Sequence, residues 1–188
     1  MSKLNEYKKK RNFKKSPEPK GGKASKKKPI FVVQKHDASH LHYDLRLEVD
    51  GVLKSWAVPK GPSLNPETKR LAAMTEDHPI DYAEFEGVIP EGYGAGTVMV
   101  WDKGTYVNES EKDGKEISTK DALEKGHISF TLQGKKMKGG WSLIHMKNRG
   151  KNWLLIKKDD EYADKRKKII NEDKSAKSGR TLAQIKKE

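Results

Sequence analysis

Two histidines and an aspartate stand at a spacing that could hold a metal ion. His36 comes just ahead of a predicted strand, and His42 and Asp44 lie two residues apart within it. Next neighbours on one face of a strand are roughly 7 Å apart, so these side chains can converge. Neutral imidazole and carboxylate are usual ligands of a borderline divalent ion, and three ligands leave coordination positions open for water or substrate. The spacing therefore indicates a metal-ligand set, while His40 on the same face could equally point to solvent.

Cationic side chains and a further histidine follow this set along the chain. Arg46 shares the strand face of Asp44, and guanidinium is the usual clamp for phosphate. Lys60 lies in a proline-stiffened loop, Arg70 begins an apolar strand, and His78 could serve as general acid or phosphate ligand because its ordinary pKa is about 6.5. Each has an ordinary alternative: a solvated strand face, a solvated loop lysine, a charge at a strand end and a surface turn. Together they predict metal-assisted chemistry on a phosphate.

The strand that carries the ligands alternates with a period of two from residue 40 to residue 49. One face holds apolar residues that can pack on a core, namely Leu41, Tyr43, Leu45, Leu47 and Val49. Asp50-Gly51 is a hairpin dipeptide, and residues 52–58 form the next predicted strand. Further short strands are predicted at residues 30–34, 70–75, 127–132, 140–146 and 153–157, with a hairpin of residues 97–101 and 104–107. Short helices are predicted at residues 120–125 and 181–187. Many short strands predict a sheet that closes on itself or folds in two layers.

The positive charge is concentrated at the two ends of the chain. Residues 1–28 hold 12 Lys and Arg against 2 acidic residues, whereas residues 29–156 hold 17 against 18, and the whole chain carries +13. Residues 1–28 are therefore predicted to be a basic N-terminal arm, residues 29–156 the domain body, and residues 157–188 a charged C-terminal tail or linker. Basic arms on a near-neutral body are typical of nucleic-acid binding, although lysine-rich tails can also be merely solvated.

Composition excludes several classes of protein. There is no cysteine, so disulfides, thiolate metal sites and cysteine nucleophiles are absent. No apolar run approaches the roughly 20 residues that span a bilayer, and no secretory signal follows the basic start. We expect a soluble, cytoplasmic protein.

Several long motifs of the chain closely resemble the 3′-phosphoesterase module of bacterial DNA ligase D. The motifs are FVVQKHDASHLHYDLRL at 31–47, WAVPKGP at 56–62, EDHP at 76–79, FEG at 85–87 and PEGYG at 90–94. The resemblance runs from about Tyr7 to the strand at 153–157. It implies a mainly β fold, a closed antiparallel β-barrel with short flanking helices. It also implies a metal-dependent enzyme, with Mn²⁺ favoured and Zn²⁺ or Co²⁺ as alternatives.

The activity that the resemblance implies has two steps. A 3′-terminal ribonucleoside is removed from a primer strand to leave a 3′-phosphate, which is then removed to leave a 3′-OH. The family's metal-ligand pattern falls on His36, His42 and Asp44. Its catalytic and phosphate-contacting pattern falls on Arg46, Lys60, Arg70, His78 and Tyr82, with Glu76 at an acidic position of the same pocket and Arg11 and Glu18 at positions linked to activity. Asn12 stands where the family usually has aspartate.

Two other functions remain as alternatives at this stage. A non-catalytic nucleic-acid-binding barrel of a repair complex would need neither His36 nor His78. An iron oxygenase could also use two histidines and one carboxylate, although the basic arm and the Arg/Lys set argue against it. The resemblance implies primer–template DNA with a 3′-terminal ribonucleotide or 3′-phosphate as partner, together with a ligase and polymerase of end joining. We expect a monomer, associated with the nucleoid.

Overall fold

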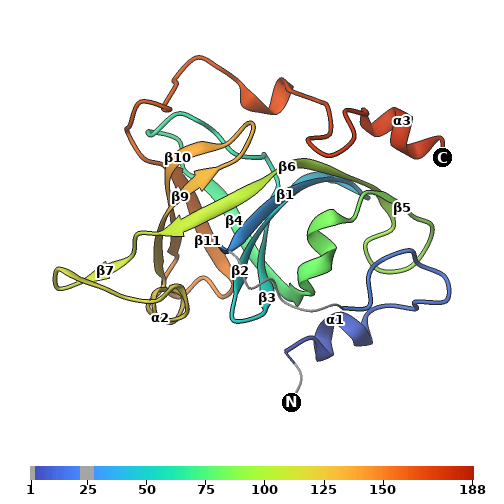
Figure 1. The fold of residues 1–188 in the computed structure, drawn as a ribbon, viewed down its shortest axis with the longest axis horizontal. Helices are drawn as coiled ribbons and strands as arrows, with labels where there is room; N and C mark the ends of the chain where they lie inside the picture. Colours follow the sequence, from blue (N-terminus) through green and yellow to red (C-terminus); the bar gives the residue numbers. More distant parts are fainter. Residues whose placement is uncertain (1–2, 22–27) are drawn as a thin grey trace.

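The computed structural model describes residues 3–21 and 28–188, and its centre is a closed antiparallel barrel of eight strands (Figure 1). The strands follow one another around the barrel as β1-β2-β3-β4-β11-β10-β9-β6, and β6 pairs with β1 to close it. Their bounds are β1 (Ile30–Asp37), β2 (Leu41–Val49), β3 (Val52–Val58), β4 (Arg70–His78), β6 (Gly96–Asn108), β9 (His127–Gln133), β10 (Lys138–His145) and β11 (Asn152–Lys157). The predicted mainly β fold, a closed barrel with short flanking helices, is confirmed.

Shorter elements surround the barrel. Strand β5 (Gly87–Ile89) extends the sheet beyond β6, and β7 (Glu111–Lys112) pairs with β8 (Lys115–Glu116) as a small separate hairpin. The helices are α1 (Asn5–Lys9), α2 (Thr119–Lys125) and α3 (Leu182–Lys186), with 3₁₀ turns η1 (Ile80–Glu84) and η2 (Ile169–Asn171). The predicted helices near residues 120–125 and 181–187 are therefore present. Among the described residues, no helix has the length and apolar character needed to cross a membrane.

The alternation of β2 divides its side chains between two environments. Tyr43, Leu45 and Leu47 point into the barrel and belong to its main core, which also holds Trp56, Trp101 and Trp141. The intervening residues of β2 lie on the outer face of the sheet. A smaller apolar cluster covers part of that face, built from barrel residues such as Val32 and Leu53 and from flanking residues Tyr7, Ile80 and Tyr82. The predicted polar face of β2 is thus an outer face, and His42, Asp44 and Arg46 lie on the outside of the barrel.

The turn between β2 and β3 is the predicted two-residue hairpin. Asp50 and Gly51 have φ values of 50° and 81°, and Val49 pairs with Val52 across the turn. Positive φ at both central residues matches the right-handed twist of the flanking strands, which is why Asp-Gly favours this connection. The turn fixes the register of β2 against β3 and so places Asp44 opposite Ala57 and Arg46 opposite Ser55.

The hairpin predicted from residues 97–101 and 104–107 is wrong. Residues 96–108 form the single strand β6, and its register against β1 shifts near Asp102. The Asp102 side chain is buried and accepts hydrogen bonds from backbone amides, those of Lys103, Lys135, Lys136 and Met137. A Cβ at Gly104 would clash with the Gln133 carbonyl, so the glycine serves close strand packing. The Asp-Lys-Gly sequence marks an irregularity in one strand.

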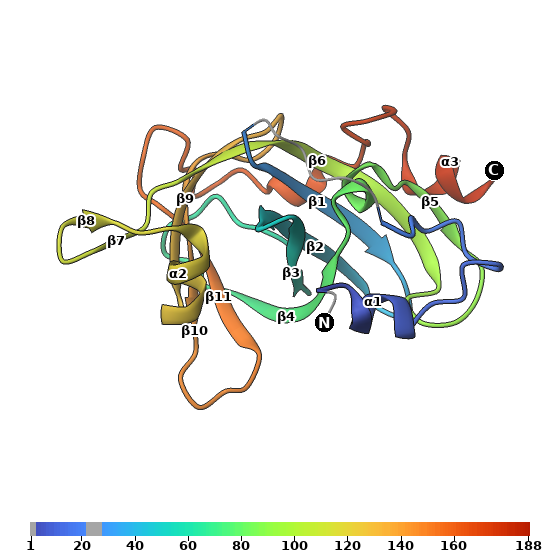
Figure 2. The ribbon, with the colours of Figure 1, turned by 60° about the horizontal axis from the view of Figure 1, so that its bottom comes forward.

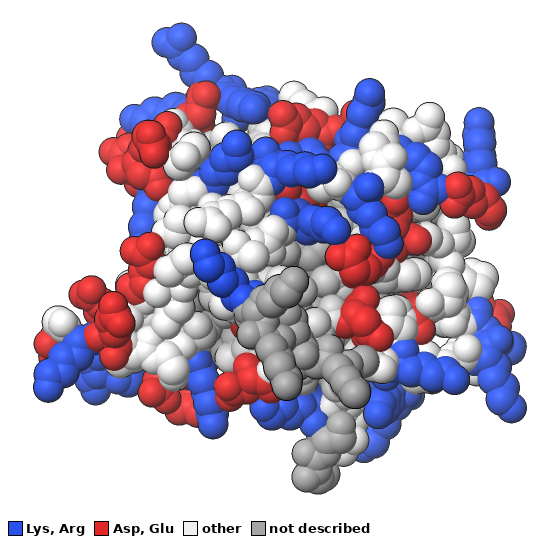
Figure 3. Space-filling view, in the orientation of Figure 1, with Lys and Arg blue, Asp and Glu red and all other residues white. Residues whose placement is uncertain are grey.

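Both ends of the chain pack on the barrel. In the N-terminal arm, α1 lies beside β4 and the Tyr7 side chain is fully buried (Figure 2). Beyond β11 the C-terminal segment runs over the barrel, burying Ile169 and Ile185 in the main core, and the Trp101 indole donates to the Glu172 carbonyl at 2.6 Å. Many Lys and Arg side chains gather where this segment crosses the upper part of the face in Figure 3. Residues 1–2 and 22–27 of the predicted arm lie outside the described residues.

Candidate functional site

The three predicted metal ligands meet on the outer face of the barrel. His36 at the end of β1 lies directly opposite His42 on β2, and Asp44 follows two residues later on the same face. Asp44 Oδ2 is 3.5 Å from His36 Nδ1 and 3.2 Å from His42 Nε2, and the ligand atoms of all three lie within 4.8 Å of one another. A cross-strand pair and a same-strand neighbour therefore form one compact donor set.

The second nitrogen of each imidazole is held by a backbone carbonyl. His36 Nε2 donates to Gly94 O at 2.7 Å, and His42 Nδ1 donates to His40 O at 2.9 Å. Each ring therefore turns its other nitrogen toward Asp44, which is the arrangement that fixes the tautomer of metal-binding histidines. Two imidazole nitrogens and a carboxylate suit a borderline divalent ion and leave positions free for water or a phosphate oxygen. The donor set thus fits a divalent metal ion.

Interactions among these side chains shift the pKa values of Asp44 and His42. Burial alone would raise the pKa of Asp44, but hydrogen bonds with His36 and His42 and the charge of Arg46 hold it well below its usual range. Burial alone would lower the pKa of His42, but the hydrogen bond and charge of Asp44 outweigh it and raise that pKa. Asp44 is consequently an anion, and metal binding competes with a proton on His42.

Arg46 lies next to the ligand set, with its guanidinium held on three sides. Its Nε donates to Gln34 Oε1 at 2.7 Å, one terminal nitrogen donates to Ser55 Oγ at 2.8 Å, and the other lies 3.6 Å from Asp44 Oδ2. The guanidinium also lies 5.0 Å from the ring centroid of Tyr82. These contacts hold a planar cation beside the metal-ligand set, the position required to contact a phosphate bound there.

His78 at the end of β4 lies between two arginines. Its Nδ1 donates to the Glu76 carbonyl at 2.9 Å, and its Nε2 faces a terminal nitrogen of Arg11 at 3.2 Å, which donates to it. Burial, followed by the charges of Arg46 and Arg11, lowers the pKa of His78 well below its ordinary value. The imidazole is therefore neutral in this arrangement.

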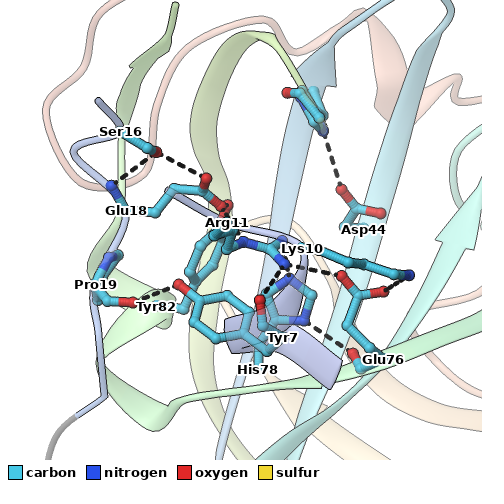
Figure 4. A network of polar contacts seen from close by, with 12 residues as sticks. Tyr7, Lys10, Arg11, Ser16, Glu18, Pro19, Asp44, Glu76, His78 and Tyr82 are labelled. Atoms are coloured by element: carbon cyan, nitrogen blue, oxygen red, sulfur yellow. Dashed lines mark hydrogen bonds and ion pairs between the residues drawn. The ribbon is translucent and has the colours of Figure 1, made fainter. Parts of the chain in front are cut away.

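The N-terminal arm forms one wall of the site through a network around Arg11 (Figure 4). Arg11 Nε donates to Glu18 Oε2 at 2.7 Å, and another guanidinium nitrogen donates to Glu76 Oε1 at 3.1 Å. The Tyr82 hydroxyl donates to Glu18 Oε2 at 2.9 Å. Burial and the charge of Glu18 raise the pKa of Tyr82 against the opposing charge of Arg46. Tyr82 is thus a neutral hydrogen-bond donor, and the arm is joined to the barrel by buried ion pairs.

One cavity of about 310 Å³ brings these side chains together, and it contains every predicted site residue except Lys60 and Arg70. Its predicted members are Arg11, Glu18, His36, His42, Asp44, Arg46, Glu76, His78 and Tyr82. Asn12 lies outside it, on the wall of a neighbouring cavity. The outer face of β1, β2 and β4 and the arm therefore build a single site.

Lys60 and Arg70 line a separate cavity at the ends of β3 and β4. Between Thr75 and His78, β4 has one more residue than the facing stretch of β3. This bulge shifts the alternation, so that Arg70 shares the face of buried Ala72 whereas His78 lies on the outer face. The bulge therefore places Arg70 and His78 on different faces of β4, although the family resemblance had assigned both to the phosphate-contacting set.

Sequence reasoning missed residues that orient the site. Gln34 is fully buried, and its amide nitrogen donates to Tyr82 O at 2.8 Å and to Phe85 O at 3.0 Å while its oxygen holds Arg46. The signal was a lone amide in an apolar strand, two residues before His36. Tyr93 and Gly94 also line the cavity, and both belong to the PEGYG motif at residues 90–94, to which no role had been assigned.

A barrel with a divalent-metal donor set and buried arginines on its outer face has the features that a phosphoesterase requires. The sequence profile of the DNA ligase D 3′-phosphoesterase domain matches residues 34–145, which is more than half of the chain, and the chain belongs to this family. The resemblance seen in the motifs is confirmed.

The similar proteins are much longer than this chain. A multifunctional non-homologous end joining protein LigD of Pseudomonas aeruginosa is 53% identical over 166 residues, covering 85% of this chain and 19% of the relative. The LigD protein of Mycolicibacterium smegmatis is 45% identical over 166 residues, 85% of this chain and 21% of the relative. That of Mycobacterium tuberculosis is 42% identical over 158 residues, 80% of this chain and 19% of the relative. The chain thus spans about a fifth of the length of these relatives.

Proposed function

We propose that the protein is a metal-dependent phosphoesterase that heals the 3′ ends of DNA. It removes a 3′-terminal ribonucleoside and then the resulting 3′-phosphate, leaving a 3′-OH for repair or ligation. The observation that carries the proposal is the placement of the donor set of His36, His42 and Asp44 beside Arg46 and His78 in one cavity. Family membership supports it, since the family is one of 3′-phosphoesterases.

Each step breaks one bond between phosphorus and an ester oxygen and forms one bond between phosphorus and the oxygen of water. Water adds to phosphorus, the bond to the leaving oxygen breaks, and that oxygen takes up a proton. A divalent ion held by His36, His42 and Asp44, with Mn²⁺ proposed and Zn²⁺ or Co²⁺ as alternatives, would polarise a phosphoryl oxygen and bind water.

The protein's own groups bind the phosphate and supply the proton. Arg46 offsets charge on the equatorial oxygens, and Arg11 lies close enough to His78 to contact the same phosphate. A bound phosphate neutralises these arginines, which raises the pKa of His78 and lets its Nε2 carry a proton for the leaving oxygen. The Tyr82 hydroxyl is a second proposed donor to the phosphate, and Glu76 and Glu18 position Arg11.

Lys60 and Arg70 are proposed to contact phosphates outside the central cavity. They lie where β3 ends and β4 begins, the end of the sheet at which β2 carries His42. A primer strand that leaves the metal-ligand set at this end would meet both cations. The partners we propose are primer–template DNA and a ligase and polymerase of end joining, in the cytoplasm at the nucleoid.

A primer–template with a single 3′-terminal ribonucleotide tests the function, with and without Mn²⁺. We expect ribonucleoside removal followed by phosphate removal in the presence of metal, and resistance of an all-deoxy 3′-OH end. Arg46→Ala and His78→Ala should each lower the rate of 3′-phosphate removal about 10²-fold, because each removes a charge or proton needed in the transition state. Steady digestion of the all-deoxy primer would show that the substrate class is wrong. Near wild-type rates in both variants would show that the chemistry occurs elsewhere.

A further inference from the structure

A second cavity adjoins the site on the side of the N-terminal arm. Its volume is about 350 Å³, and its walls come from the arm and from the glycine loop at residues 91–93. Arg11, Glu18 and Tyr93 line both this cavity and the one that holds the metal-ligand set, so the two share a wall. The volume falls within the range of about 300–1,000 Å³ of small-molecule sites. The second cavity is therefore adjacent to the proposed phosphate site.

Tyr93 stands where the two cavities meet. Its side chain is 50% exposed, a large share for an aromatic residue. Lys10 Nζ lies 4.6 Å and the Arg11 guanidinium carbon 5.6 Å from the centre of its ring. Cations of the arm thus lie over the ring, while the residue as a whole remains half exposed. An open aromatic ring beside cations and a phosphate pocket is the usual platform for stacking a nucleobase.

The loop that carries Tyr93 also touches the metal-ligand set. Gly92 and Gly94 have φ values of 86° and 78°, so the chain turns sharply on either side of the tyrosine. The Gly94 carbonyl is the acceptor that orients His36, at 2.7 Å. Tyr93 is therefore one residue from the carbonyl that orients a predicted metal ligand, and it lines the cavity that holds this ligand.

We propose that the second cavity, named here the nucleoside cavity, binds the terminal nucleoside that leaves in the first step, with its base stacked on Tyr93. This inference rests on the proposed two-step function. In that step water adds to phosphorus, the bond from phosphorus to the nucleoside O5′ breaks, O5′ takes up a proton, and the nucleoside departs from the nucleoside cavity. A 3′-phosphate end has no group beyond its phosphate, so the second step leaves this cavity unused.

Comparing the two substrates therefore distinguishes a role of Tyr93 in stacking the base from a role at the phosphate or the metal ligands. Steady-state kinetics of Tyr93→Ala, Tyr93→Phe and the wild type are compared on a 3′-terminal ribonucleoside end and on a 3′-phosphate end of the same primer. Base–aromatic stacking predicts a rise in KM of about 5- to 150-fold for Tyr93→Ala on the ribonucleoside end. We expect a much smaller change in KM for Tyr93→Ala on the 3′-phosphate end, because that end carries no base that could stack on the ring. Tyr93→Phe keeps the ring and should behave as the wild type on both ends.

Tyr162→Ala is the matched control, because this tyrosine is 45% exposed on the C-terminal segment and lines neither cavity. An unchanged KM of Tyr93→Ala on the ribonucleoside end would overturn the proposal. Equal losses on the two ends would also overturn it, because they would show that Tyr93 acts on the phosphate or the metal site. A wild-type protein that processes neither end would refute the proposed function instead.

Discussion

Replacing Gln34 by leucine should loosen Arg46 and slow both proposed reactions. Gln34 is fully buried, accepts a hydrogen bond from Arg46 Nε at 2.7 Å, and donates to Tyr82 O at 2.8 Å and Phe85 O at 3.0 Å. Leucine has a similar size but no polar atom, so it removes one hydrogen bond to a charged group and two to neutral carbonyls.

The structure sets the size of both effects. A hydrogen bond to a charged group contributes about 1.5–3 kcal/mol and a neutral one about 0.5–1.5 kcal/mol, so Gln34→Leu should lower the free energy of unfolding by about 2.5–6 kcal/mol. Arg46 keeps its hydrogen bond to Ser55 and its proximity to Asp44, so it is displaced and not released. A displacement of this kind should lower kcat by about 10- to 10²-fold.

Urea unfolding gives the stability, and Mn²⁺-dependent 3′-phosphate removal gives kcat at a temperature where the variant is folded. Gln133→Leu is the control, because Gln133 is exposed on β9 and its loss should change stability by no more than about 0.5 kcal/mol. A folded Gln34→Leu protein with wild-type kcat would refute the idea that Gln34 positions Arg46. A wild-type urea midpoint would refute the stability argument.

Three further predictions concern the metal, the arm and pH. His42→Ala should lose Mn²⁺ binding in titration calorimetry, since the two remaining ligands hold the ion poorly. The control His145→Ala should bind Mn²⁺ normally, because the His145 ring hydrogen-bonds the Gly150 carbonyl. Equal affinities of the two variants would contradict the ligand assignment. Lys8 and Lys14 are exposed, and replacing both by glutamine should change the dependence of DNA binding on salt. If each lysine neutralises one phosphate, the slope of the logarithm of the DNA-binding constant against the logarithm of the salt concentration should flatten by about 1.8. An unchanged slope would show that both lysines are only solvated. Burial would raise the pKa of Glu86, but hydrogen bonds from the C-terminal segment and a backbone amide hold it below its ordinary value of 4.5. A carboxyl group whose pKa is lower in the folded state stabilises the protein above the pKa of the unfolded state, and this stabilisation is lost as the pH falls through the pKa of the folded state. Between about pH 6 and pH 3 the melting temperature should therefore fall more for the wild type than for Glu86→Gln. Parallel plots of melting temperature against pH would contradict this.

The metal-ligand face could be predicted because it depends on local alternation alone. Tyr43 and Leu45 must face the core, which forces His42 and Asp44 to the other side, and the Asp-Gly turn fixes the register of the next strand. No contact remote in sequence is needed for that inference. The fold class followed from the same short-range signals and from the family motifs.

Other features depend on distant partners and could not be predicted from local pattern. The bulge in β4 that turns Arg70 away from His78 lies in a stretch with neither glycine nor proline. The sequence around Asp102 is typical of a turn. It continues as a strand because the backbone amides of residues 135–137 donate hydrogen bonds to the Asp102 carboxylate. The packing of the arm likewise needs the apolar cluster on the outer face, which receives Tyr7.

The contribution of the arm to the site has a consequence for partial unfolding. Between α1 and β1 the described residues of the arm add no strand to the barrel, and their contacts with it include the buried Tyr7 ring, the ion pair of Arg11 with Glu76 and the hydrogen bond from Tyr82 to Glu18. Segments with few anchors detach at a lower free-energy cost than the global transition. Detachment of the arm would uncover Glu76 and His78 while β1 and β2 still hold His36 opposite His42. Amide exchange should therefore be faster in α1 than in β2, and a protein population with an opened arm would retain the metal ligands but lack one wall of the phosphate site.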